Sequence, residues 1–185
     1  IERTMKILKR MQAEQKADAL SKRAEEMERR QEELEKQMQN TNPNDSEKRK
    51  ELAQKQDMLR KELSNINKDM KELENLMKEI GEKEMPMSDM KKAQDDLNFD
   101  ETSSEMQEAS ESMQYGDFEK AKKNQRKSAR KMSQLSQNMK DLKKKMQDKV
   151  SKEAQRKMQK ALNDMLETSK NQEKLRNKTQ KSDYN

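Results

Sequence analysis

Two kinds of side chain in this sequence could do chemistry, namely paired carboxylates and closely spaced methionines. The adjacent acids Glu25-Glu26 and Asp95-Asp96 are of the type that general acid–base catalysis uses when a pocket shifts the pKa of one member. The segment Met85–Met90 holds three thioethers around a proline, and thioethers are ligands that suit Cu(I). Both patterns also have a structural explanation, because charged pairs commonly lie on solvated helix faces and methionine packs well in helical cores.

The residues that most often complete a catalytic or metal site are missing from the sequence. It contains no His and no Cys, which removes the commonest general base, the most frequent transition-metal ligand and the thiol nucleophile. We find no glycine-rich phosphate loop and no nucleophile motif. The sequence therefore predicts no enzyme activity, no catalytic, cofactor-binding or metal-binding residues, and no cofactor, with the methionines as core residues.

The composition restricts the architecture to long helices or disorder. Of the 185 residues, 43% are charged and only 28% are hydrophobic, whereas an ordinary domain is roughly half apolar and a quarter charged. A compact single core is therefore excluded. Disordered chains lack an apolar period, and this chain has one. Only 2 Gly and 2 Pro interrupt it, so long helices can run between them.

Apolar residues recur at alternating spacings of three and four, the period of a coiled-coil seam. The first predicted helix, 2–38, has a seam that changes phase before Ala17. The predicted seams are Ala17, Leu20, Ala24, Met27, Gln31, Leu34 and Met38; then Leu59, Leu63, Ile66, Met70, Leu73, Met77 and Ile80; then Phe118, Ala121, Met132, Leu135, Met139, Leu142 and Met146, where Gln125 and Ser128 or Ala129 fill weak steps.

Breaker residues divide the chain into three predicted parts. Residues 1–81 form a long helical hairpin with a polar turn at 40–46, in which Asn44, Asp45 or Ser46 caps the second helix, with Asn44 and Glu47 fitting a capping box. Gly81 ends that helix. Residues 82–117 form an acidic connector with short helices, one of them capped by Ser88 or Asp89. Residues 118–180 form one or two basic long helices, capped by Asp117, with a frayed tail at 176–185.

The charges of the connector and of the following helix are opposite. Residues 82–117 carry eleven acidic residues against three lysines, a net charge of −8. Residues 118–160 carry sixteen basic residues against four acidic ones, a net charge of +12. We expect the two segments to fold back on each other across the turn at Gly116. Two alternatives stay open, a basic-helix binder of nucleic acid or an anionic membrane surface, and a chaperone-like helical cradle that uses adaptable methionines.

Six stretches of the sequence follow a common helical pattern rich in Met, Gln and Lys: Gln31–Leu34, Met85–Met87, Met106–Ala109, Lys120–Met132, Ala161–Leu166 and Gln172–Leu175. They resemble a large uncharacterised bacterial membrane-anchored family, a domain of unknown function with long Met/Gln/Lys-rich extracytoplasmic helices. The chain departs from the family pattern at Thr168 and Lys170, where more apolar residues are expected. The resemblance implies a segment of the periplasm or cell envelope, and it supplies no catalytic residues.

Together these observations predict an all-α fold, an elongated antiparallel helical bundle or coiled coil. We expect a non-catalytic structural spacer or protein-interaction module that is a fragment of a larger bacterial envelope protein. Its expected partners are other proteins, or copies of itself, held through helical seams. We expect no small-molecule substrate and no membrane span in this segment. A nucleic-acid partner is less expected than a protein partner. Sequence alone does not assign a compartment.

Overall fold

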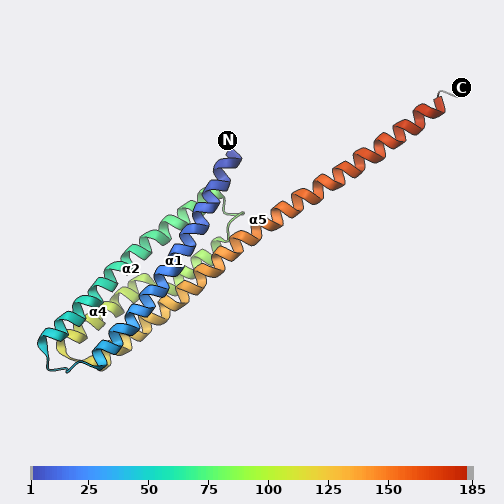
Figure 1. Ribbon diagram of the computed structural model, residues 1–185. Helices are drawn as coiled ribbons and strands as arrows, with labels where there is room; N and C mark the ends of the chain where they lie inside the picture. The colour runs from blue at the N-terminus through green and yellow to red at the C-terminus, as the bar shows by residue number, and fades with distance from the viewer. Residues whose placement is uncertain (1, 183–185) are drawn as a thin grey trace. The chain divides into compact units, whose positions relative to one another are not determined.

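The computed structural model describes the backbone of residues 2–182, and the side chains of residues 4–149 and of some positions between 156 and 174. All its regular elements are helices (Figure 1). The chain divides into two units, residues 1–146 and 147–185, which we describe separately. The helices are α1 (Glu2–Gln39), α2 (Ser46–Ile80), α3 (Met87–Leu97), α4 (Phe99–Tyr115) and α5 (Phe118–Ser182), which begins in the first unit.

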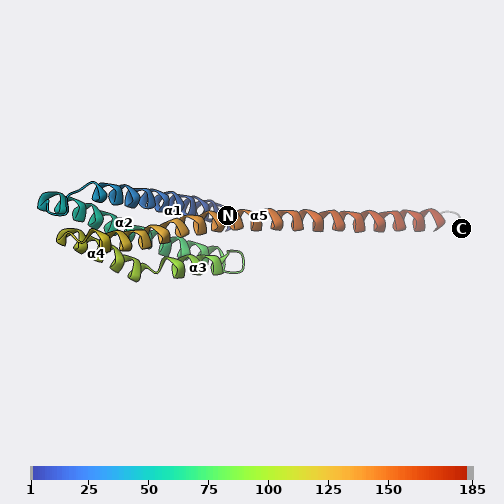
Figure 2. The same ribbon diagram turned by 90° about the horizontal axis from the view of Figure 1, so that it is seen from below.

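The first unit is an antiparallel helical bundle, which confirms the predicted all-α fold. Helix α2 packs against α1, α3 and α4. Helices α3 and α4 follow one another along one side, and together they take the place of one long helix (Figure 2). The first part of α5, up to Met146, closes the bundle through contacts with both α1 and the α3–α4 pair. The finer prediction of coiled-coil packing stays a prediction.

The predicted seams form the core of this bundle. Leu63, Ile66, Met70, Leu73 and Met77 of α2 have no exposed surface. The seam residues of α1 and α5 named above are buried in the same way, except that Phe118 and Ala129 are only partly buried, so Ser128 fills the weak step. Each fully buried side chain of this size contributes roughly 1.5–3 kcal/mol. The methionines of the seams therefore act as packing residues, which suits their flexible, unbranched shape.

Local capping sets the helix boundaries, with two departures from the predictions. Asp45 caps α2, since its Oδ1 accepts from the backbone N–H of Lys48 at 3.1 Å, and the predicted Asn44 capping box is not formed. Helix α3 begins after Pro86 without a side-chain cap, so the prediction of Ser88 or Asp89 was wrong. The fixed φ of proline suits the entry to a helix, and because proline has no backbone N–H, one fewer donor needs an acceptor there.

Local backbone and capping preferences also set the remaining helix boundaries. Gly81 ends α2, and its N–H donates to the carbonyl of Met77 at 3.2 Å. Asn98 separates α3 from α4 with a left-handed φ of 40°, and its side chain accepts from the N–H of Glu101. Asp117 caps α5 through the N–H of Lys120 at 3.0 Å.

The second unit, residues 147–182 of the described chain, is a single helical segment. It belongs to α5, so the region 118–180, predicted as one or two long helices, is one helix. The side chains of Met165 and Leu166 are 71% and 61% exposed. The helix extends to Ser182, and the last three residues of the predicted tail lie outside the described residues, as do the side chains of Val150, Ala154, Met158 and Ala161.

Candidate functional site

Ion pairs join the basic helix to the acidic connector, as the charge counts predicted. Nζ of Lys131 lies 2.8 Å from Glu101, and Nζ of Lys145 lies 2.5 Å from Asp89. Glu105, which is almost completely buried, lies 3.3 Å from Lys131. The positive charge of α5 is thus partly neutralised by α3 and α4, which orients these helices more than it stabilises them.

Helix α1 supplies a second set of acids to α5, and this set was missed by the sequence analysis. Lys143 donates to Asp18 at 2.6 Å, Lys140 donates to Glu25, and Arg126 pairs with Glu35. Asp18 and Glu25 are seven residues apart beside the α1 seam. That heptad spacing could have revealed the pairing, because flanking charges of a helical seam often contact the neighbouring helix.

The Asp18 carboxylate makes the folding stability of the bundle depend on pH. Hydrogen bonds from Lys143 and then Lys22 lower the pKa of Asp18 from its ordinary 3.8 to about 2. A carboxylate whose pKa is lower in the folded state than in the unfolded state stabilises the fold while it is ionised. This stabilisation is complete above about pH 4 and is lost as the pH falls toward 2. The pKa values of Glu25 and Glu101 are lowered for the same reason, by Lys140 and Lys131 respectively.

We therefore expect the Asp18→Asn variant to melt below the wild-type temperature at pH 5, with a difference that shrinks toward zero at pH 2. Thermal melts followed by circular dichroism across this range measure it. Asp95→Asn is the matched control, because Asp95 is exposed and has no ion pair among the described residues. A melting difference for Asp18→Asn that stays constant with pH would contradict the assigned role.

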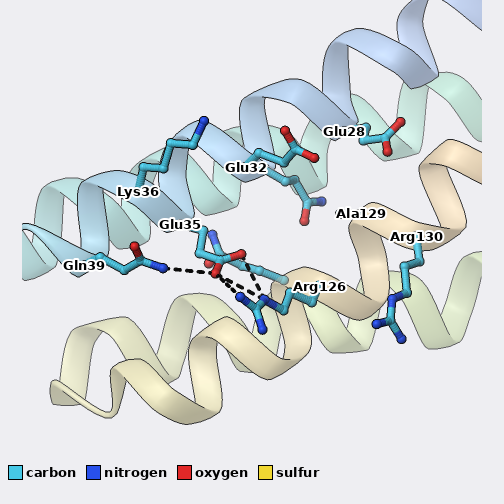
Figure 3. Close-up of a pocket in the computed structure, with 10 residues that line it drawn as sticks. Glu28, Glu32, Glu35, Lys36, Gln39, Arg126, Ala129 and Arg130 are labelled. Carbon is cyan, nitrogen blue, oxygen red and sulfur yellow. Dashed lines mark hydrogen bonds and ion pairs between the residues drawn. The ribbon is translucent and has the colours of Figure 1, made fainter.

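A polar groove of about 470 Å³ lies between α1 and α5 (Figure 3). At one end, Glu35 accepts from Arg126 at 2.8 Å and from Gln39 at 3.2 Å. This contact raises the pKa of Arg126. Glu28, Glu32, Lys36 and Arg130 line the rest of the rim.

Buried amide side chains lie beneath this groove, within the core. Gln125 Nε2 donates to Gln56 Oε1 at 3.1 Å, and Ser128 Oγ donates to Gln31 Oε1 at 2.6 Å. All four residues are at most 1% exposed. The sequence had suggested weak seam steps at Gln125 and Ser128, and the structure places a cross-helix polar layer there.

The residues first considered for catalysis or metal binding occupy ordinary helical positions. Glu25 pairs with Lys140, Glu26 pairs with Arg29, and Asp96 accepts from Asn138 at 2.9 Å. Met85 and Met90 are buried in the hydrophobic core and Met87 packs against it. No group of acidic residues in the described part of the chain could hold a metal ion.

An apolar patch lies on the first turns of α1. Its members are the side chains of Met5, Ile7, Leu8 and Met11, which are 51–54% exposed. The buried line of α1 continues through Ala13 in the same phase as Ala17 and Leu20, so the predicted change of seam phase before Ala17 is wrong: Met5 and Leu8 lie outside the core. None of the described helices is apolar enough over a sufficient length to cross a membrane.

Comparisons of the chain with protein-family models, with curated proteins and with solved structures find no match. The family resemblance therefore stays an expectation.

Proposed function

We propose that this chain is a non-catalytic protein-interaction module and structural spacer within a larger bacterial envelope protein. The observation that carries the proposal is the apolar patch of Met5, Ile7, Leu8 and Met11. The envelope setting depends on the resemblance stated above. The proposed partner is a protein, either a different one or a second copy of this chain.

The patch supports a docking role because its residues contrast with the rest of the bundle. Nearly all the large apolar residues of the seams are buried, whereas four such residues within two turns of α1 remain half exposed. Clustered exposed apolar side chains on a soluble surface commonly mark a protein contact. The basic-helix alternative receives less support, because Lys131, Lys140, Lys143 and Lys145 are engaged in ion pairs within the bundle.

Site-specific photo-crosslinking in bacterial cells tests the proposal. A photoreactive amino acid replaces Leu8 in the patch, and in the control it replaces Lys50, which is exposed on α2. We expect a discrete covalent adduct from position 8 that is absent from position 50, with a mass that identifies either another protein or a second copy. No adduct from position 8, or the same adducts from both positions, would overturn the proposal.

A further inference from the structure

The groove between α1 and α5 has unsatisfied hydrogen-bonding atoms in its lining. Gln31 and Gln125 line it, although each is only 1% exposed. Gln31 Nε2 and Gln125 Oε1 have no hydrogen-bond partner among the described residues. A buried polar atom without a partner is costly, typically about 1–3 kcal/mol, and buried polar groups are normally satisfied by protein atoms or ordered water.

The two free atoms are complementary to a single chemical group. Gln31 offers a donor and Gln125 offers an acceptor. A carboxamide carries one acceptor oxygen and two donor hydrogens, so it can satisfy both atoms at once. A carboxylate lacks the donor and an ammonium lacks the acceptor, so neither fits both, whereas a hydroxyl or a water molecule also carries both functions but on a single oxygen atom.

The shape and charge of the groove favour a peptide as the carrier of that group. Its α1 wall runs from Glu28 to Gln39, which at 1.5 Å per residue is roughly 16 Å long. An extended segment of about five residues spans that length. On the rim, Glu28 and Glu32 have no ion-pair partner among the described residues, and neither does Arg130 on the opposite wall. A basic residue beside the carboxamide would therefore find a free carboxylate.

We propose that this groove binds a partner polypeptide by inserting one of its glutamine or asparagine side chains between Gln31 and Gln125. The site is distinct from the apolar patch, so the inference does not depend on the proposed function. The inserted carboxamide accepts from Gln31 Nε2 and donates to Gln125 Oε1. A site built to hydrogen-bond a polar group rejects an analogue that lacks it, because the buried atoms are then left unpaired.

Titration followed by nuclear magnetic resonance tests the proposal on the full 185-residue chain. The probe is the peptide acetyl-Lys-Ala-Gln-Ala-Ala with a free carboxyl end, and its matched analogue carries methionine in place of glutamine. The readout is the side-chain amide resonances of Gln31 and Gln125, assigned from their loss in the Gln31→Met and Gln125→Met variants. We expect saturable shifts with the glutamine peptide and binding at least about tenfold weaker for the methionine peptide.

Variants separate the groove from general effects. Gln31→Met and Gln125→Met should each weaken peptide binding about tenfold while the bundle stays folded, because methionine is a good helix former of similar size. Gln137→Met, an exposed position on α5 outside the groove, should leave binding unchanged. Equal binding of the two peptides would assign the contact to the peptide backbone and overturn the proposal. Absence of shifts at millimolar peptide would also overturn it, and would mean that water alone satisfies the glutamines.

Discussion

Replacing Leu63 with alanine should lower the free energy of unfolding of the bundle by about 2–5 kcal/mol. Leu63 lies in the middle of α2, has no exposed surface and belongs to the hydrophobic core cluster of the bundle. Helix α2 packs against α1, α3 and α4, so a cavity at this position weakens contacts on several sides. Close packing allows such a cavity to collapse only in part, which adds a cavity cost to the lost transfer energy.

Chemical denaturation followed by circular dichroism at 222 nm (the ordinary helix signal) measures this effect. The matched control is Met58→Ala on the same helix, because Met58 is 59% exposed and its truncation should change stability by less than about 0.5 kcal/mol. Similar losses for both variants would mean that α2 does not bury the face assigned to it.

Replacing Gly116 with alanine should cost about 2 kcal/mol or more, the second largest effect that we expect. Gly116 joins α4 to α5 with a φ of +83°, a left-handed conformation that costs an L-residue with a Cβ roughly 1–2 kcal/mol. An added Cβ would also lie 3.0 Å from the carbonyl oxygen of Pro43 and 3.1 Å from Nη1 of Arg49. These two atoms already form a hydrogen bond with each other, so neither can move away from the added Cβ without weakening that bond.

The Gly116→Asn variant separates the two contributions. Asparagine tolerates the left-handed conformation better than alanine but brings the same Cβ. We expect it to be more stable than Gly116→Ala and less stable than the wild type in the same denaturation experiment. A Gly116→Ala variant as stable as the wild type would contradict both the turn geometry and its contact with residue 43.

The core residues could be predicted from the sequence, because they depend only on the spacing of the apolar residues along each helix. Leu59 to Ile80 keeps a spacing of three and four without interruption, and all of these seam residues are buried. Gly81, Asn98 and Asp117 were also predictable, since each has a backbone or capping preference that acts locally. Asn44 and Asp45 both have a preference for the N-cap position. The backbone conformation of the turn decides between them, and it brings Asp45 to the free N–H of Lys48.

The groove could not be predicted, because it depends on which helices become neighbours. Net charge indicated that the acidic connector would contact α5, but it did not reveal the additional contact with α1. The polar layer had a signal, since Gln31, Gln56 and Gln125 each occupy a core position of a helix. Only the register of the folded bundle brings Gln56 of α2 against Gln125 of α5, and that register is a tertiary property.

The helices close into a bundle within one chain, with α1 against α5. A disulfide between these two helices can test this arrangement, because the sequence contains no cysteine. The hydroxyls of Ser21 on α1 and Ser136 on α5 lie 3.1 Å apart in the core, so cysteines at both positions can bond after a small movement.

The measurement is the oxidation product of the Ser21→Cys/Ser136→Cys double variant in dilute solution, analysed on a non-reducing gel and by mass spectrometry. We predict a monomer with one internal disulfide. Because that bond closes a long loop, the oxidised protein should also melt above its reduced form. Disulfide-linked dimers, or two free thiols after oxidation, would contradict the claim.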